Sequence, residues 1–506
     1  MKSKLIIPIM ILFMSINSIA QSKVEKIEPS FWWKGMKNPE LQLLIYGKNI
    51  SEAKLSVNDS AVKITKLHKT DNPNYLIADL MISESVSVGK INIEFEFSED
   101  LRQTMEYEIK ERAKREGPGY VNKSDVIYLV TPDRFANGDT SNDSIEEMPD
   151  KLNRENQWGR HGGDIKGLIN KLDFIKDLGI TALWLMPVQE NNSSGSSYHG
   201  YAITDMYSID PRFGNNELYR KFVDESHKKG IKVIMDLVNN HIGINHYWMK
   251  NMPSKDWVNH PDTFMGTNFN PIVYMDPHSS ESEKSKLMSG WFSQGMPDLN
   301  QRNKFVNKYL IQNAIWWIEY AGIDGIRMDT YPYPYPESLA EWNKVVLNEY
   351  PDFYLVGETW VSQPAYAAYY QGGKINHNGY DSNLGSVTDF PLYEAIIKAF
   401  REKGSIYNVY QTLSQDFLYS DPYNILTFID NHDVARAFTE MSGDIDKMKL
   451  ALTVLLTTRG IPQIYYGTEI LMEGRSHGIL RADYPGGFPG DKKSAFTPEG
   501  RTDEQN

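Results

Sequence analysis

The sequence contains no cysteine, so the protein has neither a disulfide nor an acyl anchor on an N-terminal cysteine. No apolar run in it is long enough to span a bilayer as a stable helix, which argues against a membrane anchor. Basic residues are also in deficit, 53 against 66 acidic residues. The net charge of −13 disfavours nucleic acid and anionic membranes as partners and leaves a neutral ligand or cations.

The first twenty residues have the layout of a signal peptide. Lys2 and Lys4 precede an apolar run over residues 5–14, and small residues, Ser18 and Ala20, come before Gln21. The pattern predicts cleavage after residue 20 and export of the protein. We therefore expect a periplasmic or secreted location.

The next segment, residues 21–111, is predicted to be a β-sandwich. Apolar and polar residues alternate strictly over residues 90–97, which is typical of a strand with one buried face. Similar runs at 41–46 and 75–81 are separated by turn residues. A length of 506 residues predicts two to four domains. Residues 112–120, basic and containing glycine, are interpreted as the linker to the second domain.

From residue 121 onward a single unit recurs: an amphipathic helix, a glycine and an apolar strand. Gly179, Gly230, Gly322 and Gly460 each stand at such a junction, where a left-handed glycine can end the helix. Strands buried on both faces and alternating with helices predict a parallel α/β domain over 121–506, and eight candidates suggest a (β/α)8 barrel. The candidates are residues 126–130, 182–186, 233–238, 325–328, 353–356, 387–390, 425–429 and 463–466. Residues of about 241–300 break the rhythm and are interpreted as an excursion domain after strand three.

Polar residues stand at the ends of four predicted strands. Catalytic groups of such a barrel gather at the carboxyl ends of its strands, so these side chains are expected at one mouth. Hydrolysis of an acetal needs a proton donor and a negative charge beside the developing oxocarbenium ion, which two carboxyl groups can supply. The four strand ends are Asp236 to His241, Gly325 to Asp329, Gly357 to Trp360 and Asp430 to Asp433.

Arg327 and Asp329 are two residues apart on one strand, so their side chains point to the same side. The guanidinium is expected to hold Asp329 ionised, as a nucleophile must be. A structural Arg–Asp pair is the alternative, and spacing alone does not decide between the two. Asp236 is expected to hold Arg327 in place without touching substrate.

The four motifs together resemble the α-amylase superfamily of retaining glycoside hydrolases. The resemblance implies that Asp329 is the nucleophile, Glu358 the general acid/base and Asp433 a third carboxylate that stabilises the transition state. It also implies sugar-binding roles for a second set of residues, with Tyr201 as the stacking platform. That set is His199, Tyr201, His241, Arg327 and His432.

Two further features are similar to the neopullulanase, cyclomaltodextrinase and maltogenic amylase group: the segment Met296 to Asn300 and the N-terminal β-sandwich. Members of this group cleave maltodextrins, cyclodextrins and pullulan, which implies endo-acting retaining hydrolysis of α-glucosidic bonds. A transglycosylase or isomerase on the same site, or a glucan-binding protein without catalysis, are the alternatives. Trp32 and Trp33 are expected in the sandwich core or in a dimer interface, and a homodimer through the N-terminal domain is possible.

A calcium site is predicted in the stretch that begins at Asp133. Hard oxygen donors surround a glycine turn there, which suits Ca²⁺, and an ordinary polar turn is the alternative. The stretch resembles a calcium loop of neopullulanase-type enzymes. On that match the ligands are Asn137, Asp139, Asn142, Asp143, the Gly162 carbonyl and Asp164.

The end of the chain departs from the family pattern. The family adds a last barrel helix and a C-terminal β-sandwich after strand eight, whereas this sequence stops at Asn506. We therefore expect the C-terminal sandwich to be absent and the last helix to be truncated. An open helical ring is expected to expose apolar surface and to weaken the fold.

Overall fold

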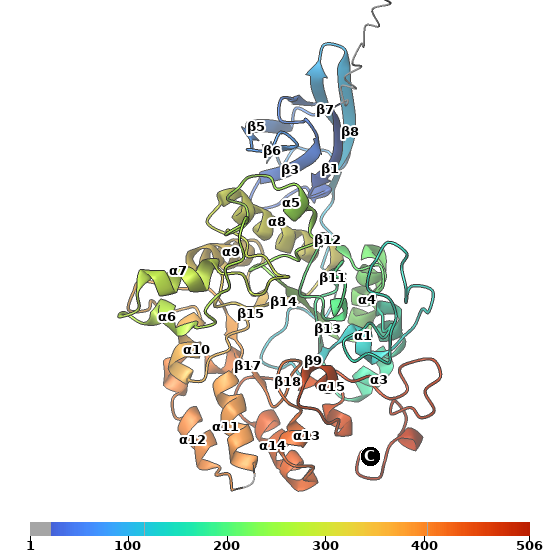
Figure 1. Cartoon of the computed structure of the whole chain (residues 1–506), viewed down its shortest axis with the longest axis vertical. Coiled ribbons are helices and arrows are strands. Elements are labelled where there is room, and N and C mark those ends of the chain that lie inside the picture. The colour runs from blue at the N-terminus through green and yellow to red at the C-terminus, as the bar shows by residue number, and fades with distance from the viewer. Residues whose placement is uncertain (1–21, 116, 402) are drawn as a thin grey trace, which may run out of the picture.

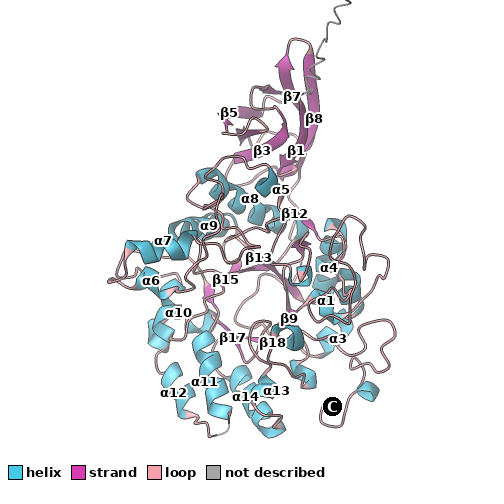
Figure 2. Cartoon of the chain, in the orientation of Figure 1, coloured by secondary structure: helices cyan, strands magenta, loops and turns pink. Residues whose placement is uncertain are grey.

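The computed structural model describes residues 22–115, 117–401 and 403–506 (Figure 1). The predicted signal peptide, residues 1–20, lies outside the described residues. Within the described ranges, no helix combines the length and the apolar character that crossing a bilayer requires. The strands gather in an N-terminal unit and in the centre of a ring of helices (Figure 2).

The N-terminal unit consists of two four-stranded sheets, in the orders β1-β3-β6-β5 and β2-β8-β7-β4. In β7, Ile91, Ile93 and Phe95 are buried while the residues between them are not, so the predicted period-two alternation is present. The strands are β1 (Lys23–Glu28), β2 (Phe31–Trp33), β3 (Glu40–Lys48), β4 (Lys54–Val57), β5 (Val62–Lys69), β6 (Tyr75–Ile82), β7 (Gly89–Ser98) and β8 (Leu101–Lys110).

The second unit is a parallel eight-stranded sheet in the order β16-β15-β14-β13-β10-β9-β18-β17. A single parallel bridge between Thr388 and Leu426 joins its two ends, so the sheet is a nearly closed barrel, as predicted. The sixth strand is shorter than predicted, because Phe390 already belongs to the following helix. The strands are β9 (Ile127–Val130), β10 (Ala182–Leu185), β13 (Lys232–Leu237), β14 (Gly325–Met328), β15 (Tyr354–Gly357), β16 (Ser386–Val387), β17 (Leu426–Phe428) and β18 (Ile461–Tyr465).

Helices follow the strands, and the predicted junction glycines separate helix from strand. Gly179, Gly230, Gly322 and Gly460 have φ angles of 83°, 69°, 73° and 101°, the left-handed region that glycine adopts without strain. The helices are α1 (Pro132–Phe135), α2 (Ile165–Asn170), α3 (Leu172–Asp177), α4 (Asn216–Lys228), α5 (Tyr247–Lys250), α6 (Ile272–Met275), α7 (Glu281–Ser289), α8 (Lys304–Ala321), α9 (Pro336–Glu349), α10 (Pro364–Tyr370), α11 (Phe390–Phe400), α12 (Tyr407–Leu413), α13 (Ala437–Glu440), α14 (Ile445–Thr457) and α15 (His477–Leu480).

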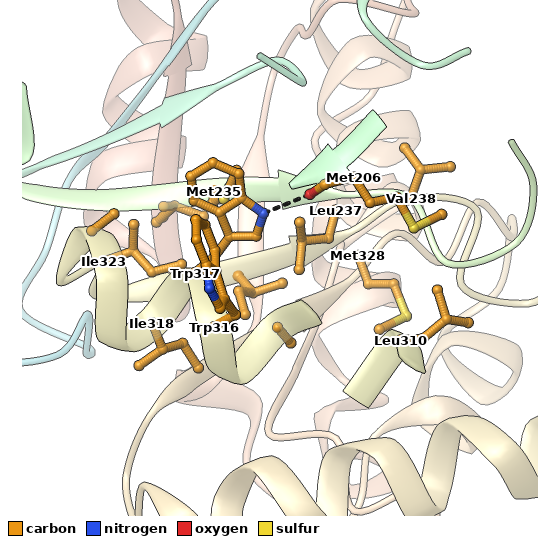
Figure 3. Close-up of a cluster of buried hydrophobic side chains, with 14 of the residues drawn as sticks. Met206, Met235, Leu237, Val238, Leu310, Trp316, Trp317, Ile318, Ile323 and Met328 are labelled. Carbon is orange, nitrogen blue, oxygen red and sulfur yellow. Dashed lines mark hydrogen bonds between the residues drawn. The ribbon is translucent and has the colours of Figure 1, made fainter. Parts of the chain in front are cut away.

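Helix α8 forms much of the core on one side of the barrel. The side chain of Asn303 caps its first turn by accepting from the amide of Phe305, and Gly322 ends it. Trp316 and Trp317 are buried among methionine, leucine and isoleucine side chains of α8 and the neighbouring strands (Figure 3). The indole of Trp317 donates to the carbonyl of Met206 at 2.9 Å, so its polar atom is satisfied.

The N-terminal unit packs on α8 and on the excursion between β13 and α8. Trp32 and Trp33 are 3% and 4% exposed, and the ring of Trp33 lies 6.4 Å from that of Trp316. Both tryptophans are thus buried within the same chain, and Trp33 lies where the sandwich meets α8. Tyr75 donates to the Asn251 carbonyl of the excursion at 2.6 Å.

The residues after β18 form only short elements. Within the part of the chain that the structure describes, α15 and single turns follow Tyr465, and no further strand is present. Two small strands, β11 (Gln189–Glu190) and β12 (Asp205–Ile209), pair in the connection between β10 and α4.

Candidate active site

The pairing of β13, β14 and β15 places two carboxylates at one level of the barrel mouth. Met328 is in register with Gly357, so Asp329 and Glu358, the next residues, leave their strands side by side. The ladder continues through them, because the Asp329 amide donates to Leu237 and the Glu358 amide to Met328, each at 2.9 Å. The pairing of the strands therefore sets the positions of the Asp329 and Glu358 backbones relative to each other.

Arg327 lies at the centre of the site and is 1% exposed. Its Nη1 donates to both carboxylate oxygens of Asp236 at 3.0 Å and to Asp329 Oδ1 at 2.7 Å. Its Nη2 lies 3.1 Å from Glu358 Oε2. One guanidinium thus holds three carboxylates, and Asp236 has the supporting contact that was expected of it. The Trp184 indole also donates to Asp236, at 3.0 Å.

The predicted ion pair of Asp329 is present and Arg327 lowers the pKa of Asp329 as expected, but other effects outweigh it. Burial raises the pKa of Asp329 to about 7, because desolvation together with the charges of Asp236 and Asp433 outweighs Arg327. Burial likewise raises the pKa of Glu358 to about 7, with Arg327 opposing and Asp329 adding to the rise. The two carboxyl groups therefore titrate together near neutral pH.

Asp433 has the opposite electrostatic setting. Burial acts to raise its pKa, but His432, Arg481 and Arg327 outweigh burial and hold the pKa well below its usual range. Arg481 Nη2 lies 2.8 Å from Asp433 Oδ1, and His432 Nε2 lies 3.0 Å from Oδ2. Asp433 thus stays ionised, whereas Asp329 and Glu358 beside it gain and lose protons near neutral pH.

Three aromatic rings lie side by side at the site, and two of them, His199 and Tyr201, line its cavity. The rings of Tyr201 and His432 are stacked at 5.7 Å, and those of His199 and Tyr201 at 5.8 Å. The Tyr201 hydroxyl lies 2.6 Å from His432 Nε2. Burial lowers the pKa of both His199 and His241 to about 3, so both imidazoles are neutral. His241 Nε2 is buried without a protein partner among the described residues, which leaves it free for a ligand.

A cavity of about 280 Å³ opens over these groups. The three carboxylates predicted from sequence line it, as do three of the five predicted sugar-binding residues, while Arg327 and His432 lie behind them. Its wall consists mainly of apolar and aromatic side chains around a few polar groups, as in small-molecule sites generally. The lining residues are His199, Tyr201, His241, Phe292, Met296, Asp329, Thr330, Pro332, Tyr333, Glu358, Trp360, Asp433, His477 and Arg481.

Several lining residues were missed from sequence. Arg481 and His477 come from the connection after β18, where no motif was recognised and an isolated arginine gives no signal. Phe292 comes from the excursion, and its ring stacks on His241 at 5.4 Å. Trp360 lies within a recognised motif, two residues after Glu358, but the sequence does not show that its side chain is 49% exposed.

Three of the six predicted calcium ligands, Asn137, Asp143 and Gly162, lie together. Asp143 Oδ1 is 2.7 Å from Asn137 Nδ2, and a Cβ placed on Gly162 would come within 2.6 Å of the same oxygen. Asn142 Oδ1 is buried with no partner among the described residues. Burial and the charge of Asp164 raise the pKa of Asp143. An orphaned amide oxygen in the residue next to a desolvated carboxylate fits a hard cation.

The other two predicted ligands are engaged by the protein. Asp164 caps α2 and accepts from the amides of Gly138, Asp139 and Gly167. Asp139 accepts from Ser141 and lies 3.3 Å from Lys166. No cluster of three or more His, Cys, Asp or Glu suited to a metal occurs among the described residues, so a cation here would need amide and carbonyl oxygens besides the Asp143 carboxylate.

Comparison with known families gives two matches that together span most of the chain. Residues 129–485 match the α-amylase catalytic domain, and residues 26–113 match the cyclomaltodextrinase N-terminal domain. Both confirm the resemblance drawn from the motifs.

Relatives with assigned names are similar over the same region. A cyclomaltodextrinase from Thermoanaerobacter pseudethanolicus is 32% identical over 370 residues, 69% of this chain and 58% of that protein. Neopullulanase 2 from Thermoactinomyces vulgaris is 32% identical over 360 residues, 70% of this chain and 57% of that protein. The chain thus spans less than two thirds of either relative. The α-amylase of Geobacillus thermoleovorans, solved with acarbose, superposes with a TM-score of 0.60 at 35% identity, over 71% of this chain and 74% of that one.

Proposed function

Because the chain belongs to the α-amylase family, we propose that it is a retaining glycoside hydrolase that cuts internal α-glucosidic bonds of maltodextrins, cyclodextrins and pullulan. The observation that carries the proposal is the attachment of Asp329 and Glu358 to one guanidinium beneath a cavity that Asp433 also lines. Retaining enzymes keep their two carboxyl groups about 5 Å apart, closer than inverting enzymes do, and a shared guanidinium favours the closer arrangement.

In the first step Asp329 attacks the anomeric carbon while the bond from that carbon to the glycosidic oxygen breaks. Glu358 gives its proton to the departing oxygen, which leaves a glycosyl ester on Asp329. Asp329 is the ionised member of the pair because its bond to Arg327, at 2.7 Å, is shorter than the 3.1 Å contact of Glu358. Glu358 Oε2 accepts from the Thr330 amide at 2.9 Å, so Oε1 carries the proton.

In the second step Glu358, now a carboxylate, takes a proton from water as the water oxygen attacks the same carbon. The ester bond breaks, and Asp329 leaves as a carboxylate. Asp433 stays ionised throughout and supplies negative charge to the oxocarbenium-like transition state. Tyr201 offers a ring face to the sugar, and the neutral His199 and His241 serve as hydrogen-bonding partners for its hydroxyls.

Digestion of pullulan tests the substrate class and the bond cut. Panose or isopanose reports cleavage of one or the other α-1,4 bond, and maltotriose reports cleavage of α-1,6 bonds. If pullulan releases none of these trisaccharides and β-cyclodextrin is also left intact, the proposal is rejected.

We also propose a structural Ca²⁺ held by Asn137, Asn142, Asp143 and the Gly162 carbonyl, with Asp139 and Asp164 joining if they exchange their present partners. The support is the orphaned oxygen of Asn142, the residue before Asp143, together with the raised pKa of Asp143. Bound Ca²⁺ supplies positive charge that compensates desolvated carboxylates and stabilises the loop. Tb³⁺ luminescence, with Asp143→Asn as the comparison, reports binding without reference to activity.

Export to the periplasm or medium is part of the proposal and rests on the sequence of residues 1–20. N-terminal mass analysis of the protein from its native host is expected to find Gln21 first. An intact Met1 would contradict it.

A further inference from the structure

Helix α12 has one buried face and one free face. Val409 is 4% exposed and packs in the core cluster that includes Ile396 of α11 and Met448 of α14. On the outer face, Tyr407 and Tyr410 lie three residues apart, so their rings project on the same side. Each is 67% exposed. Figure 1 places α12 beside α11 at the rim of the helical ring.

The exposed face of α12 is uncharged. No charged residue occurs between Lys403 and Asp416, although charged residues make up 24% of the whole chain. Ile406, Gln411 and Ser414 are exposed on the same face as the two tyrosines. A free surface is normally rich in charge, so an exposed helix of aromatic and neutral polar side chains suits an uncharged polar partner.

Among the described residues, the two rings have neither an aromatic neighbour nor a hydrogen-bond partner. Tyr393, on the adjacent α11, stacks on Phe428 at 5.0 Å. Within the described residues, the rings of Tyr407 and Tyr410 have no such aromatic neighbour, and their hydroxyls have no hydrogen-bond partner. Both faces of an aromatic ring attract C–H groups, while the phenolic hydroxyl seeks a polar partner. A pyranose, with apolar C–H faces and a rim of hydroxyls, satisfies both.

We propose that Tyr407 and Tyr410 form a second binding site for α-glucan chains on α12, separate from the catalytic cavity. No residue of α12 lines that cavity, so a chain held on α12 does not occupy it. Tethering a polymer there raises the local concentration of cleavable bonds. The inference rests on the proposed function, because that function names α-glucan as the substrate.

The size of the site favours a glucan chain over a protein partner. The helix has seven residues, so it is about 10 Å long. A stable protein interface buries roughly 800 Å² on each side, which is more than one face of such a helix offers. Two rings one helical turn apart match neighbouring sugar units of a chain.

Affinity electrophoresis in gels containing glycogen tests the site. The parent carries Glu358→Gln, so that the polymer stays intact, and the test variant adds Tyr407→Ala and Tyr410→Ala. The control adds Leu450→Ala and Leu456→Ala on α14, which shorten two side chains exposed by 54% and 52%. We expect glycogen to retard the parent and the control equally, and the apparent Kd of the tyrosine variant to rise about tenfold.

Equal retardation of all three proteins would overturn the inference, and so would a change of oligomeric state on gel filtration in the tyrosine variant. Equal melting temperatures exclude misfolding as the cause of lost retardation. The single variants Tyr407→Phe and Tyr410→Phe keep the rings and are expected to retain most of the retardation by glycogen. In a protein that keeps Glu358, the changes Tyr407→Ala and Tyr410→Ala are expected to lower the ratio of glycogen turnover to maltotriose turnover. If the protein with its native active-site residues cleaves no glucan, yet glycogen retards it and does not retard the tyrosine variant, the result would support this site and reject the proposed hydrolase.

Discussion

Arg481 Nη2 lies 2.8 Å from Asp433 Oδ1, and Arg481 Nε donates to the carbonyl of His432 at 2.7 Å. Arg481 belongs to the connection after β18, whereas Asp433 follows β17. The segment after β18 thus stabilises the charge of Asp433 and holds the backbone of His432, the residue before it.

Replacing Arg481 is expected to act through Asp433. Arg481→Gln removes a buried cation, so the pKa of Asp433 rises and kcat/KM falls about 10–100-fold. Arg481→Lys keeps the charge and is expected to lose less activity. The kcat/KM of both variants for β-cyclodextrin provides the measurement. A kcat/KM unchanged in Arg481→Gln would show that Asp433 does not depend on Arg481.

Asp329→Asn and Glu358→Gln are each expected to lower kcat roughly 10³-fold or more, because each removes a group that the chemistry cannot replace. Circular dichroism is expected to show an unchanged fold. Asp173→Asn, on a side chain 85% exposed, is the matched control and should keep full activity. Near-native turnover in either active-site variant would reject the assignment.

The same Asp329→Asn change is expected to stabilise the protein above neutral pH. Folding raises the pKa of Asp329 to about 7, from about 4 in the unfolded chain. The folded state therefore binds more protons than the unfolded state between about pH 4 and 7, and stability falls as pH rises through that window. The variant should gain on the order of 2 kcal/mol over the parent at pH 8 and little at pH 4. Urea unfolding at both pH values measures this, and a less stable variant at pH 8 contradicts it.

Removal of calcium is expected to lower the melting temperature by several degrees, because an ion that binds only the folded state stabilises it by mass action. Differential scanning fluorimetry with excess chelator, then with Ca²⁺ restored, measures the shift. Asp143→Asn should be nearly insensitive to chelator. Equal melting curves of the parent with and without chelator would speak for an ordinary polar turn.

Gly357→Ala is expected to harm both fold and activity. Gly357 is the residue directly before Glu358, and a Cβ at Gly357 would come within 2.6 Å of the Tyr331 ring. We expect a loss of roughly 1–3 kcal/mol in unfolding free energy and a drop in kcat. At Gly179 a Cβ meets nothing within 4 Å, although its φ is 83°, so Gly179→Ala should cost only about 1 kcal/mol and leave kcat unchanged. Equal effects of the two substitutions would contradict this reasoning.

Much of the fold could be predicted because its signals are local. The alternation in β7 and the junction glycines depend on neighbouring residues, and both are present in the structure. The carboxylates at 329, 358 and 433 could be placed at one mouth because the ends of parallel strands meet.

What could not be predicted depends on contacts between distant segments. Arg481 reaches Asp433 across 48 positions of sequence, and Phe292 reaches His241 across an excursion with no repeating pattern. The pKa of Asp329 was misjudged because the sequence shows its ion pair but not its burial or the charges of Asp236 and Asp433. Desolvation is a property of the whole packed site.

The two-residue strand β16 and its single bridge to β17 leave a seam in the barrel wall. Glu358 and Asp433 follow the strands on either side of β16, whereas Asp329 and Glu358 follow strands joined by a continuous ladder. Opening of the barrel at this seam would change the distance between Glu358 and Asp433 and leave the ladder that carries Asp329 and Glu358 intact. Amide hydrogen exchange in β16 that is no faster than in β14 would contradict such opening.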